Sequence, residues 1–328
     1  MKFKILAIDG GGIKGLYSST ILEHLEKKHG VSCSDCFDML CGTSTGGMIT
    51  LGLSLKLPAA DMSQIYSERG KEIFPTQNKY FGLFKQALWG GKFSDQPLRR
   101  VLQDTFGERK LSESNNLLCI PSYSITDARP WIFKYDHIEG DLDRDNKALY
   151  VDVALATSAA PTYFPIAELP SYNNKQFIDG GVWANNPSQV GLIEALTHFV
   201  GPGKPYNSVQ ILSVSSLNNT SGKPTGLSRH RSFVRWRNDL FETSLIGQSN
   251  FTNYFLSQLH ALTEVPIEYI RIPSEPISAE QQHLIQLDVA TPRAIQLIKG
   301  KGNDRGTICS KDSEISKLFQ SPKKHKIK

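Results

Sequence analysis

The pentapeptide Gly42-Thr43-Ser44-Thr45-Gly46 is the strongest local signal in this sequence. It lies between residues 37–41, whose apolar side chains predict a strand, and residues 47–56, which predict a helix ended by Pro58. A G-x-S-x-G sequence between a strand and a helix predicts a tight turn that holds its serine above the sheet in a strained backbone. The dipole of the following helix would favour negative charge near Ser44.

A second glycine-rich turn, Asp9-Gly10-Gly11-Gly12-Ile13-Lys14-Gly15, follows a strand predicted over 3–9 and precedes a helix predicted over 16–29. Two successive strand–turn–helix units predict a parallel sheet with helices packed on it. The turn matches the dinucleotide-binding pattern, but the second strand does not end in the acidic residue that this pattern expects. We favour the alternative, in which the N–H groups of Gly10, Gly11 and Gly12 form an oxyanion hole beside Ser44 and Lys14 adds positive charge.

Asp179 ends the apolar strand of a strand–turn unit predicted over 176–181, and Gly180 and Gly181 follow it in the turn. An Asp-Gly pair is also common in hairpin turns. However, a serine nucleophile needs a base within about 3 Å. None of the eight histidines lies in the small-residue, strand-end context that builds a catalytic triad. Asp179 is therefore the candidate base.

The rest of the chain predicts one domain with a helical C-terminal part. Helical patterns occupy residues 61–109, 232–262 and 278–298, and residues 218–229 are polar and loop-like. Further strands are predicted over 117–124, 131–135, 150–153 and 209–214. We expect a catalytic domain over 1–215, with 216–328 as a helical part of the same domain that ends in a basic tail, 323–328.

Composition excludes several classes of protein. Of the 328 residues 39% are hydrophobic and 21% charged, which excludes wholesale disorder, and no apolar run reaches the roughly 18–20 residues of a membrane-spanning helix. The N-terminus carries no signal peptide, so we expect a cytoplasmic protein. The basic tail contributes to a net charge of +5 and is expected to be solvated, or alternatively to favour anionic membrane surfaces.

Cysteine usage predicts free thiols, because an odd number of five is thinly spread along a chain without an export signal. The spacing of Cys33 and Cys36 is typical of metal or redox sites, but no second pair accompanies it. We therefore expect no metal and no cofactor at this pair.

The combination of motifs resembles the patatin-like phospholipase family. In that family Asp-Gly-Gly-Gly-x-(Arg/Lys)-Gly, Gly-x-Ser-x-Gly and Asp-Gly-(Ala/Gly) follow one another in this order, as Asp9–Gly15, Gly42–Gly46 and Asp179–Gly181 do here. Residues 156–165 and 183–187 are also similar to the family, so that the resemblance covers about residues 1–215. It implies a three-layer α/β fold, with a central, mostly parallel sheet, helices on both faces and a helical C-terminal extension.

The resemblance also implies a reaction. Ser44 would attack an ester carbonyl and Asp179 would accept its proton, while the N–H groups of the glycine turn stabilise the oxyanion. The implied substrates are fatty-acyl esters of membrane phospholipids, cleaved as by a phospholipase A or a lysophospholipase in lipid degradation, without a metal or a cofactor. The residues expected to support the site are Lys14, Gly15, Gly42, Gly46, Gly180 and Gly181.

Such an enzyme would act peripherally at the inner face of the membrane and would bind no nucleic-acid polymer. The apolar stretch Tyr80–Phe93 is the candidate interfacial cap, with ordinary core as its alternative. Ser215-Ser216-Leu217 departs from the Gly-Thr-Gly turn of many family members, which leaves the expected structure of that loop open.

Two alternative functions remain at this stage. The first is the same hydrolase as a ligand-switched effector, activated by a small anionic ligand such as a cyclic nucleotide and degrading membranes in antiviral (phage) defence. A ligand site would use Arg229, Arg231, Arg235 and Arg237, which otherwise form a solvated helix face. The sequence also allows the chain to form a homo-oligomer. The second alternative, a nucleotide-binding or storage protein with vestigial motifs, is disfavoured because Ser44, Asp179 and the three glycines are all present.

Overall fold

Two parallel strands at the centre of the sheet carry the two glycine-containing turns. In the computed structural model, β1 (Lys2–Ile8) pairs with β2 (Met39–Gly42), and Ile8 lies opposite Gly42. The turns that follow both strands therefore emerge side by side at the carboxyl edge of the sheet. The structure describes residues 1–75, 91–218, 222, 225–226, 228–230, 233–259 and 263–327, without the side chains of 233–235 and 237–239.

Eight strands form one sheet within this described part of the chain, in the order β5-β6-β3-β2-β1-β7-β8, with β4 paired to β3. The pairs among β3, β2, β1, β7 and β8 are parallel, whereas β4, β6 and β5 add antiparallel pairs at one side. The remaining strands are β3 (Leu117–Ser124), β4 (Arg129–Lys134), β5 (Ala167–Leu169), β6 (Lys175–Asp179), β7 (Ser208–Val214) and β8 (Ile267–Ile272).

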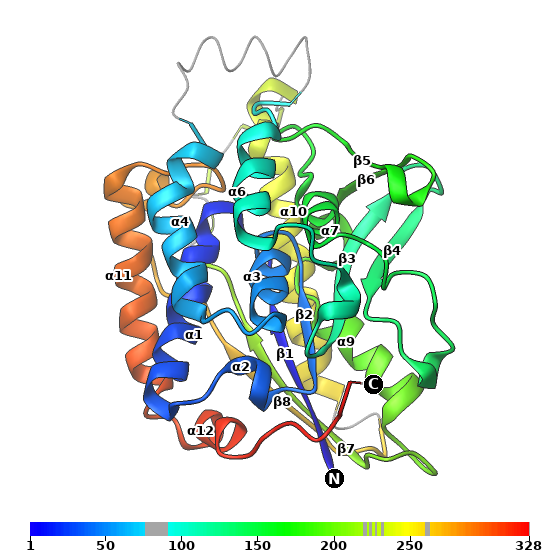
Figure 1. Ribbon diagram of the computed structural model, residues 1–328. Coiled ribbons are helices and arrows are strands. Elements are labelled where there is room, and N and C mark those ends of the chain that lie inside the picture. Colours follow the sequence, from blue (N-terminus) through cyan, green and yellow to red (C-terminus); the bar gives the residue numbers. More distant parts are fainter. Residues whose placement is uncertain are drawn as a thin grey trace.

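Helices cover both faces of this sheet, so that the fold has three layers (Figure 1). One face carries α1 (Gly15–His29), α3 (Thr45–Ser54), α4 (Ala59–Ile73), α6 (Gln96–Phe106), α7 (Tyr150–Ser158) and α11 (Pro292–Cys309). The other face carries α8 (Gly181–Ala184), α9 (Ser188–Glu194) and α10 (Phe233–Gln258). Two short helices, α2 (Cys33–Cys36) and α12 (Ser313–Phe319), pack near the amino edge of the sheet.

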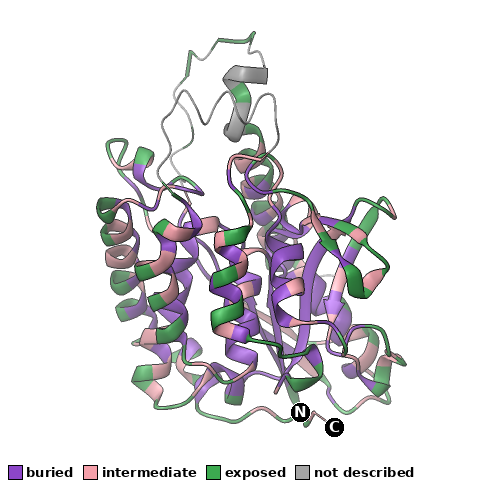
Figure 2. Cartoon of the chain, turned by 45° about the horizontal axis from the view of Figure 1, so that its top comes forward, coloured by how far each residue is buried: buried purple, intermediate pink, exposed green. Residues whose placement is uncertain are grey.

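The core lies between the sheet and these helices, where Figure 2 shows the strands and the inward helix faces as buried. The central strands β1, β2 and β7 are buried on both faces over nearly their whole length, as parallel strands between two helix layers are. All five cysteines are free and buried in this structure. Burial raises the pKa of the Cys36 thiol to about 11, which disfavours the thiolate that metal binding or redox chemistry would need.

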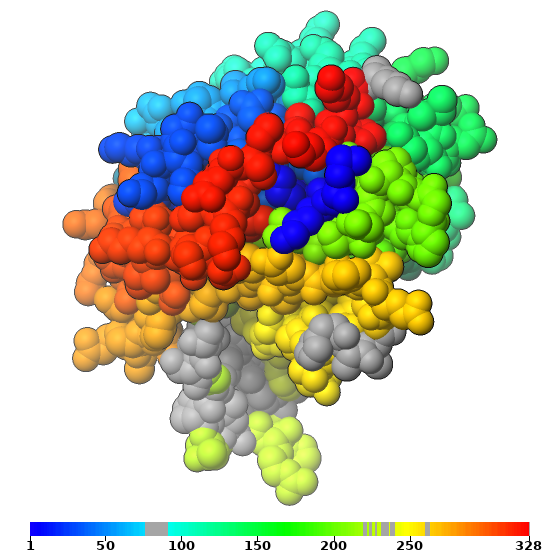
Figure 3. Space-filling view, turned by 90° about the horizontal axis from the view of Figure 1, so that it is seen from below, coloured from blue at the N-terminus to red at the C-terminus, as the bar shows by residue number. Residues whose placement is uncertain are grey.

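The end of the chain lies across the amino edge of the sheet, beside the N-terminal strand (Figure 3). The backbone N–H groups of Lys324 and His325 each donate to Asp38 Oδ1 at 2.7 Å, and Lys4 N–H donates to Asp38 Oδ2 at 2.8 Å. The backbone of the tail is therefore held in place at these residues, while Lys324 and Lys326 remain exposed. The tail lies at the opposite end of the strands from the two glycine-containing turns.

The structure corrects three expected elements. Residues 150–153 belong to helix α7, not to a strand, and the helix expected over 278–298 begins only at Pro292. The region after residue 215 is not wholly helical, because β8 pairs in parallel with β7 and extends the sheet. No helix in the described ranges is both long enough and apolar enough to cross a membrane.

Candidate active site

Ser44 lies in the sharp turn between β2 and α3, as the sequence predicts. Its backbone has φ 55° and ψ −124°, a conformation that a residue with a side chain rarely adopts. The turn is held from outside, because the Ser44 N–H donates to the Thr157 hydroxyl at 2.9 Å and that hydroxyl donates to the carbonyl of Pro121 at 2.6 Å. A strained backbone of this kind persists only where surrounding contacts hold it in place. Such strained residues are common at functional sites.

Gly46 lets this turn lie against the end of β1. A Cβ added to Gly46 would come within 2.2 Å of the carbonyl oxygen of Ile8 and 2.7 Å of that of Asp9. The absence of a side chain at this position therefore keeps the serine turn in contact with the residues that lead into the glycine turn. It explains in physical terms why the G-x-S-x-G pattern ends in glycine.

The Gly46→Ala variant is expected to lose at least 100-fold in kcat/KM for ester hydrolysis and about 1–3 kcal/mol of unfolding free energy, because the added methyl group displaces buried backbone. Gly300→Ala is the matched control. No heavy atom lies within 4 Å of a Cβ added there, so this change within α11 should leave activity unaltered and slightly raise the melting temperature. Equal effects of the two changes on activity would contradict this account of Gly46.

Asp179 ends β6, which runs antiparallel to β3 and places Asp179 opposite Ser122. Since Cys119 of β3 pairs with Cys41 of β2, this register brings Asp179 to the level just beyond β2, beside Ser44. Ser44 and Asp179 line the same cavity, and the Gly181 N–H donates to Asp179 Oδ1 at 2.7 Å.

The Asp179 carboxyl is 2% exposed, and this burial sets its acidity. Loss of hydration raises its pKa to about 7, although the neighbouring Ser44 hydroxyl and the Gly181 N–H act in the opposite direction. An aspartate with this pKa is a far better proton acceptor near neutral pH than one of ordinary acidity. Gly180 allows the close approach of β6 to β3, since a Cβ there would come within 2.2 Å of the carbonyl oxygen of Pro121.

The glycine turn differs from the expectation in one respect. The N–H of Gly10 donates to the carbonyl of Asn185 at 3.0 Å, so it is not available as an oxyanion donor. Gly11 and Gly12 line the cavity beside Ser44, and no residue of the described ranges accepts a hydrogen bond from their N–H groups. The N–H groups of Gly11 and Gly12 are therefore the ones available to bind an oxyanion.

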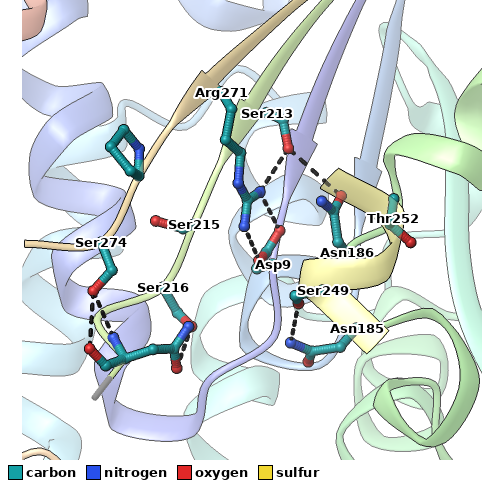
Figure 4. Close-up of polar contacts among 12 residues, drawn as sticks. Asp9, Asn185, Asn186, Ser213, Ser215, Ser216, Ser249, Thr252, Arg271 and Ser274 are labelled. Carbon is teal, nitrogen blue, oxygen red and sulfur yellow. Dashed lines mark hydrogen bonds and ion pairs between the residues drawn. The ribbon is translucent and has the colours of Figure 1, made fainter. Parts of the chain in front are cut away.

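Residues distant in sequence hold this turn from behind (Figure 4). Asp9, which is fully buried, accepts from both terminal nitrogens of Arg271 on β8, at 2.8 and 2.5 Å. Arg271 also donates to the Ser213 hydroxyl at 2.7 Å, and the Ser216 hydroxyl donates to the carbonyl of Gly10 at 2.8 Å. The Ser215-Ser216 departure from the family pattern thus supplies a direct support of the turn.

The stretch around residues 185–186 joins the site to helix α10 on the far face. The side-chain nitrogen of Asn185 donates to the Ser249 hydroxyl at 2.9 Å, and Asn186 N–H donates to Gln248 at 2.8 Å. The same helix contributes Phe241 and Leu245 to the cavity wall. Sequence reasoning placed residues 183–187 in the family pattern, but it did not predict these contacts.

Lys14 lies behind the turn and is not among the residues that line the cavity. Its ammonium group donates to Asn218 at 3.1 Å, and burial lowers its pKa, an effect that the nearby charge of Glu242 opposes. This placement favours a role in supporting the loop over one in contacting a phosphate. Gly15 lies at the start of α1, where a Cβ would meet the hydroxyl of Thr45 at 2.2 Å.

A cavity of about 30 Å³ lies in front of Ser44 and Asp179, and no histidine is among the described residues that line it. Its walls are mostly apolar, and they include Met48, Ile73, Phe74, Leu98, Tyr163 and Phe164. Such a site can bind an alkyl group beside a serine and its base.

Two sequence expectations fall largely outside the described residues. Of the candidate cap, only residues 91–93 are described, and Phe93 is buried against the rings of Phe74 and Phe164. Of the four arginines proposed for an anionic ligand, Arg229 is exposed. Arg231 and the side chains of Arg235 and Arg237 lie outside the described part of the chain.

Comparison with known proteins gives a consistent result. Residues 6–191 match the family described as "Patatin-like phospholipase". A "cGAMP-activated phospholipase" of Pseudomonas aeruginosa is 31% identical over 304 residues, which cover 92% of this chain and 87% of that protein. One of the same name from Escherichia coli is 29% identical, covering 98% and 94%. The solved structure of VipD from Legionella pneumophila aligns with a TM-score of 0.44 and 10% identity, over 94% of this chain and 66% of that one. The chain belongs to the patatin-like phospholipase family, and it is a lipid acyl hydrolase.

Proposed function

We propose that this hydrolase cleaves fatty-acyl esters of membrane phospholipids, with Ser44 as nucleophile and Asp179 as base. The observation that carries the proposal is the position of Ser44 beside the buried Asp179, which lines the same apolar cavity and whose pKa burial raises to about 7. The strained turn that presents Ser44 supports the same roles.

In the first half of the reaction, Asp179 takes the hydroxyl proton as Ser44 Oγ bonds to the ester carbonyl carbon. The N–H groups of Gly11 and Gly12 stabilise the negative oxygen that forms. Collapse of this intermediate breaks the ester bond, and the departing alcohol of the lysophospholipid takes the proton from Asp179. In the second half, water gives a proton to Asp179 and its oxygen bonds to the acyl carbon. The bond between that carbon and Ser44 Oγ then breaks, Ser44 takes the proton back from Asp179, and the fatty acid leaves.

The carboxyl edge of the sheet is the side of the molecule expected to face the membrane, because it bears the serine, the aspartate and the apolar cavity. The basic tail lies at the opposite edge, where Asp38 and Asp35 hold its backbone. We therefore do not assign membrane recruitment to the tail. Association is proposed to be peripheral and to act through the apolar surroundings of the cavity.

Regulation by a nucleotide is the second part of the proposal. Three relatives named cGAMP-activated phospholipase align with 92–98% of this chain at 28–31% identity, so the similarity extends well beyond the catalytic motifs. We propose that cGAMP or a related cyclic nucleotide activates this enzyme as well. Such control would restrict the degradation of the cell's own membrane to a defence response.

The test is release of free fatty acid from mixed phospholipid vesicles, with and without cGAMP. Wild type should hydrolyse, Ser44→Ala should be inactive, and Ser67→Ala, which changes an exposed hydroxyl on α4, should behave as wild type. Activity confined to the samples with cGAMP supports the switch, and equal activity without it contradicts that part. Hydrolysis by Ser44→Ala, or none by wild type under either condition, would overturn the catalytic proposal.

A further inference from the structure

A second apolar cavity, here called the inner cavity, lies behind the catalytic one, between helices α3, α4 and α6. It measures about 20 Å³. Three of the residues that line it, Met48, Ile73 and Leu98, also line the catalytic cavity. These three side chains thus form a partition between Ser44 and a space deeper in the fold.

The inner cavity is lined to receive hydrocarbon. Its walls are aliphatic or aromatic except for two hydroxyls, and both of these are engaged elsewhere. Tyr66 OH donates to the carbonyl of Thr45 at 3.2 Å and accepts from the Thr45 hydroxyl, and Thr105 Oγ1 donates to the carbonyl of Val101 at 2.7 Å. Both hydroxyl hydrogens are thus already donated, and a water molecule would find too few partners in this wall, whereas an alkyl chain needs none.

The partition lies where an acyl chain bound to Ser44 would meet it. Met48 follows Ser44 by one helical turn, its N–H bonded to the Ser44 carbonyl at 3.0 Å, so both residues lie on the same face of the chain. Methionine is unbranched and adopts many conformations at low cost. Met48 in the partition and Met62 in the inner wall are therefore the side chains expected to change conformation when a chain enters.

We propose that the inner cavity receives the distal part of the acyl chain and sets the chain length that the enzyme prefers. The inference rests on the function proposed above, because it takes the acyl group to be attached to Ser44. Each methylene that enters an apolar site contributes roughly a fourfold gain in binding. Blocking the space for two or three methylenes should thus cost about 15–60-fold, and only for chains long enough to pass the partition.

The experiment measures kcat/KM for p-nitrophenyl esters from butyrate to myristate, in the presence of cGAMP and mixed phospholipid vesicles. Val101→Phe and the milder Thr105→Leu both fill the inner cavity, and Gln103→Leu, on the exposed face of the same helix, is the matched control. The ratio of the long-chain to the short-chain value is expected to fall about 10-fold or more in both filling variants and to remain at the wild-type ratio in Gln103→Leu.

The two proposals fail in different ways. An unchanged chain-length ratio in folded, active Val101→Phe and Thr105→Leu would overturn the role of the inner cavity and leave the proposed reaction intact. A wild type that hydrolyses none of the esters would overturn the proposed reaction itself. If Val101→Phe unfolds, which circular dichroism would reveal, the ratio for Thr105→Leu decides.

Discussion

Asp179→Asn is expected to abolish hydrolysis, with a loss of about 10⁴-fold in kcat, while making the folded chain more stable at pH 8. The amide cannot take the proton of Ser44, but it can still accept the N–H of Gly181. Because burial raises the pKa of Asp179 from its usual 3.8 to about 7, ionisation of this group in wild type lowers the stability of the fold as pH rises between these values. Removing the charge restores up to roughly 4 kcal/mol above pH 7 and almost nothing at pH 4.

Denaturant unfolding of wild type and Asp179→Asn at pH 5 and pH 8 measures the difference in their unfolding free energies. The pH dependence of hydrolysis by wild type is a second check. Its kcat/KM should fall on the acid side with a midpoint near pH 7, since only the ionised carboxylate can act as base. Asp152→Asn, on α7 and outside the cavity, is the control for activity. Hydrolysis by Asp179→Asn, or a stability difference that does not change with pH, would contradict the assigned role.

Arg271→Met is expected to cost about 3–5 kcal/mol of unfolding free energy and at least 100-fold in kcat/KM. The substitution leaves the carboxylate of Asp9 buried without its partner, at the position from which the glycine turn starts. Arg271→Lys should recover part of both losses, because an ammonium group can neutralise Asp9 but cannot bind both of its oxygens in the same geometry. Thermal unfolding and ester hydrolysis measure the two effects.

A double variant separates positioning of the turn from stability of the fold. Asp9→Leu combined with Arg271→Met removes the unpaired charge and should regain most of the lost stability. If the ion pair positions the N–H groups of Gly11 and Gly12, kcat should remain low in the double variant although its fold is again stable. Full recovery of kcat along with stability would show that the ion pair serves the fold alone.

The central part of the fold was predictable because its signals are local. The strand–turn–helix units at residues 3–29 and 37–56 carry their own turn residues, and the structure has both of them. Asp179 was singled out by the glycines that follow it and by the absence of a suitable histidine. Residues 150–153 were misassigned because α7 is buried almost all round, which removes the polar face that distinguishes a helix from a buried strand.

The supports of the site could not be predicted, because they join residues far apart in the chain. Nothing near Asp9 in sequence indicates that Arg271 is its partner, 262 residues away. The engagement of the Gly10 N–H was equally hidden, since its acceptor is a backbone carbonyl that every residue possesses. The role of Thr157 was hidden for the same reason, since its hydroxyl accepts the N–H of Ser44 from 113 residues away in the chain.

The order of these contacts along the chain has a consequence for the enzyme during its own synthesis. Ser44 and Asp179 both leave the ribosome before Arg271, which pairs with Asp9, and before Leu287, whose carbonyl accepts the N–H of Ile13. A nascent chain that already carries nucleophile and base therefore lacks the contacts that shape the glycine turn between them. Translation itself therefore delays the assembly of the hydrolytic centre until Leu287 has been synthesised.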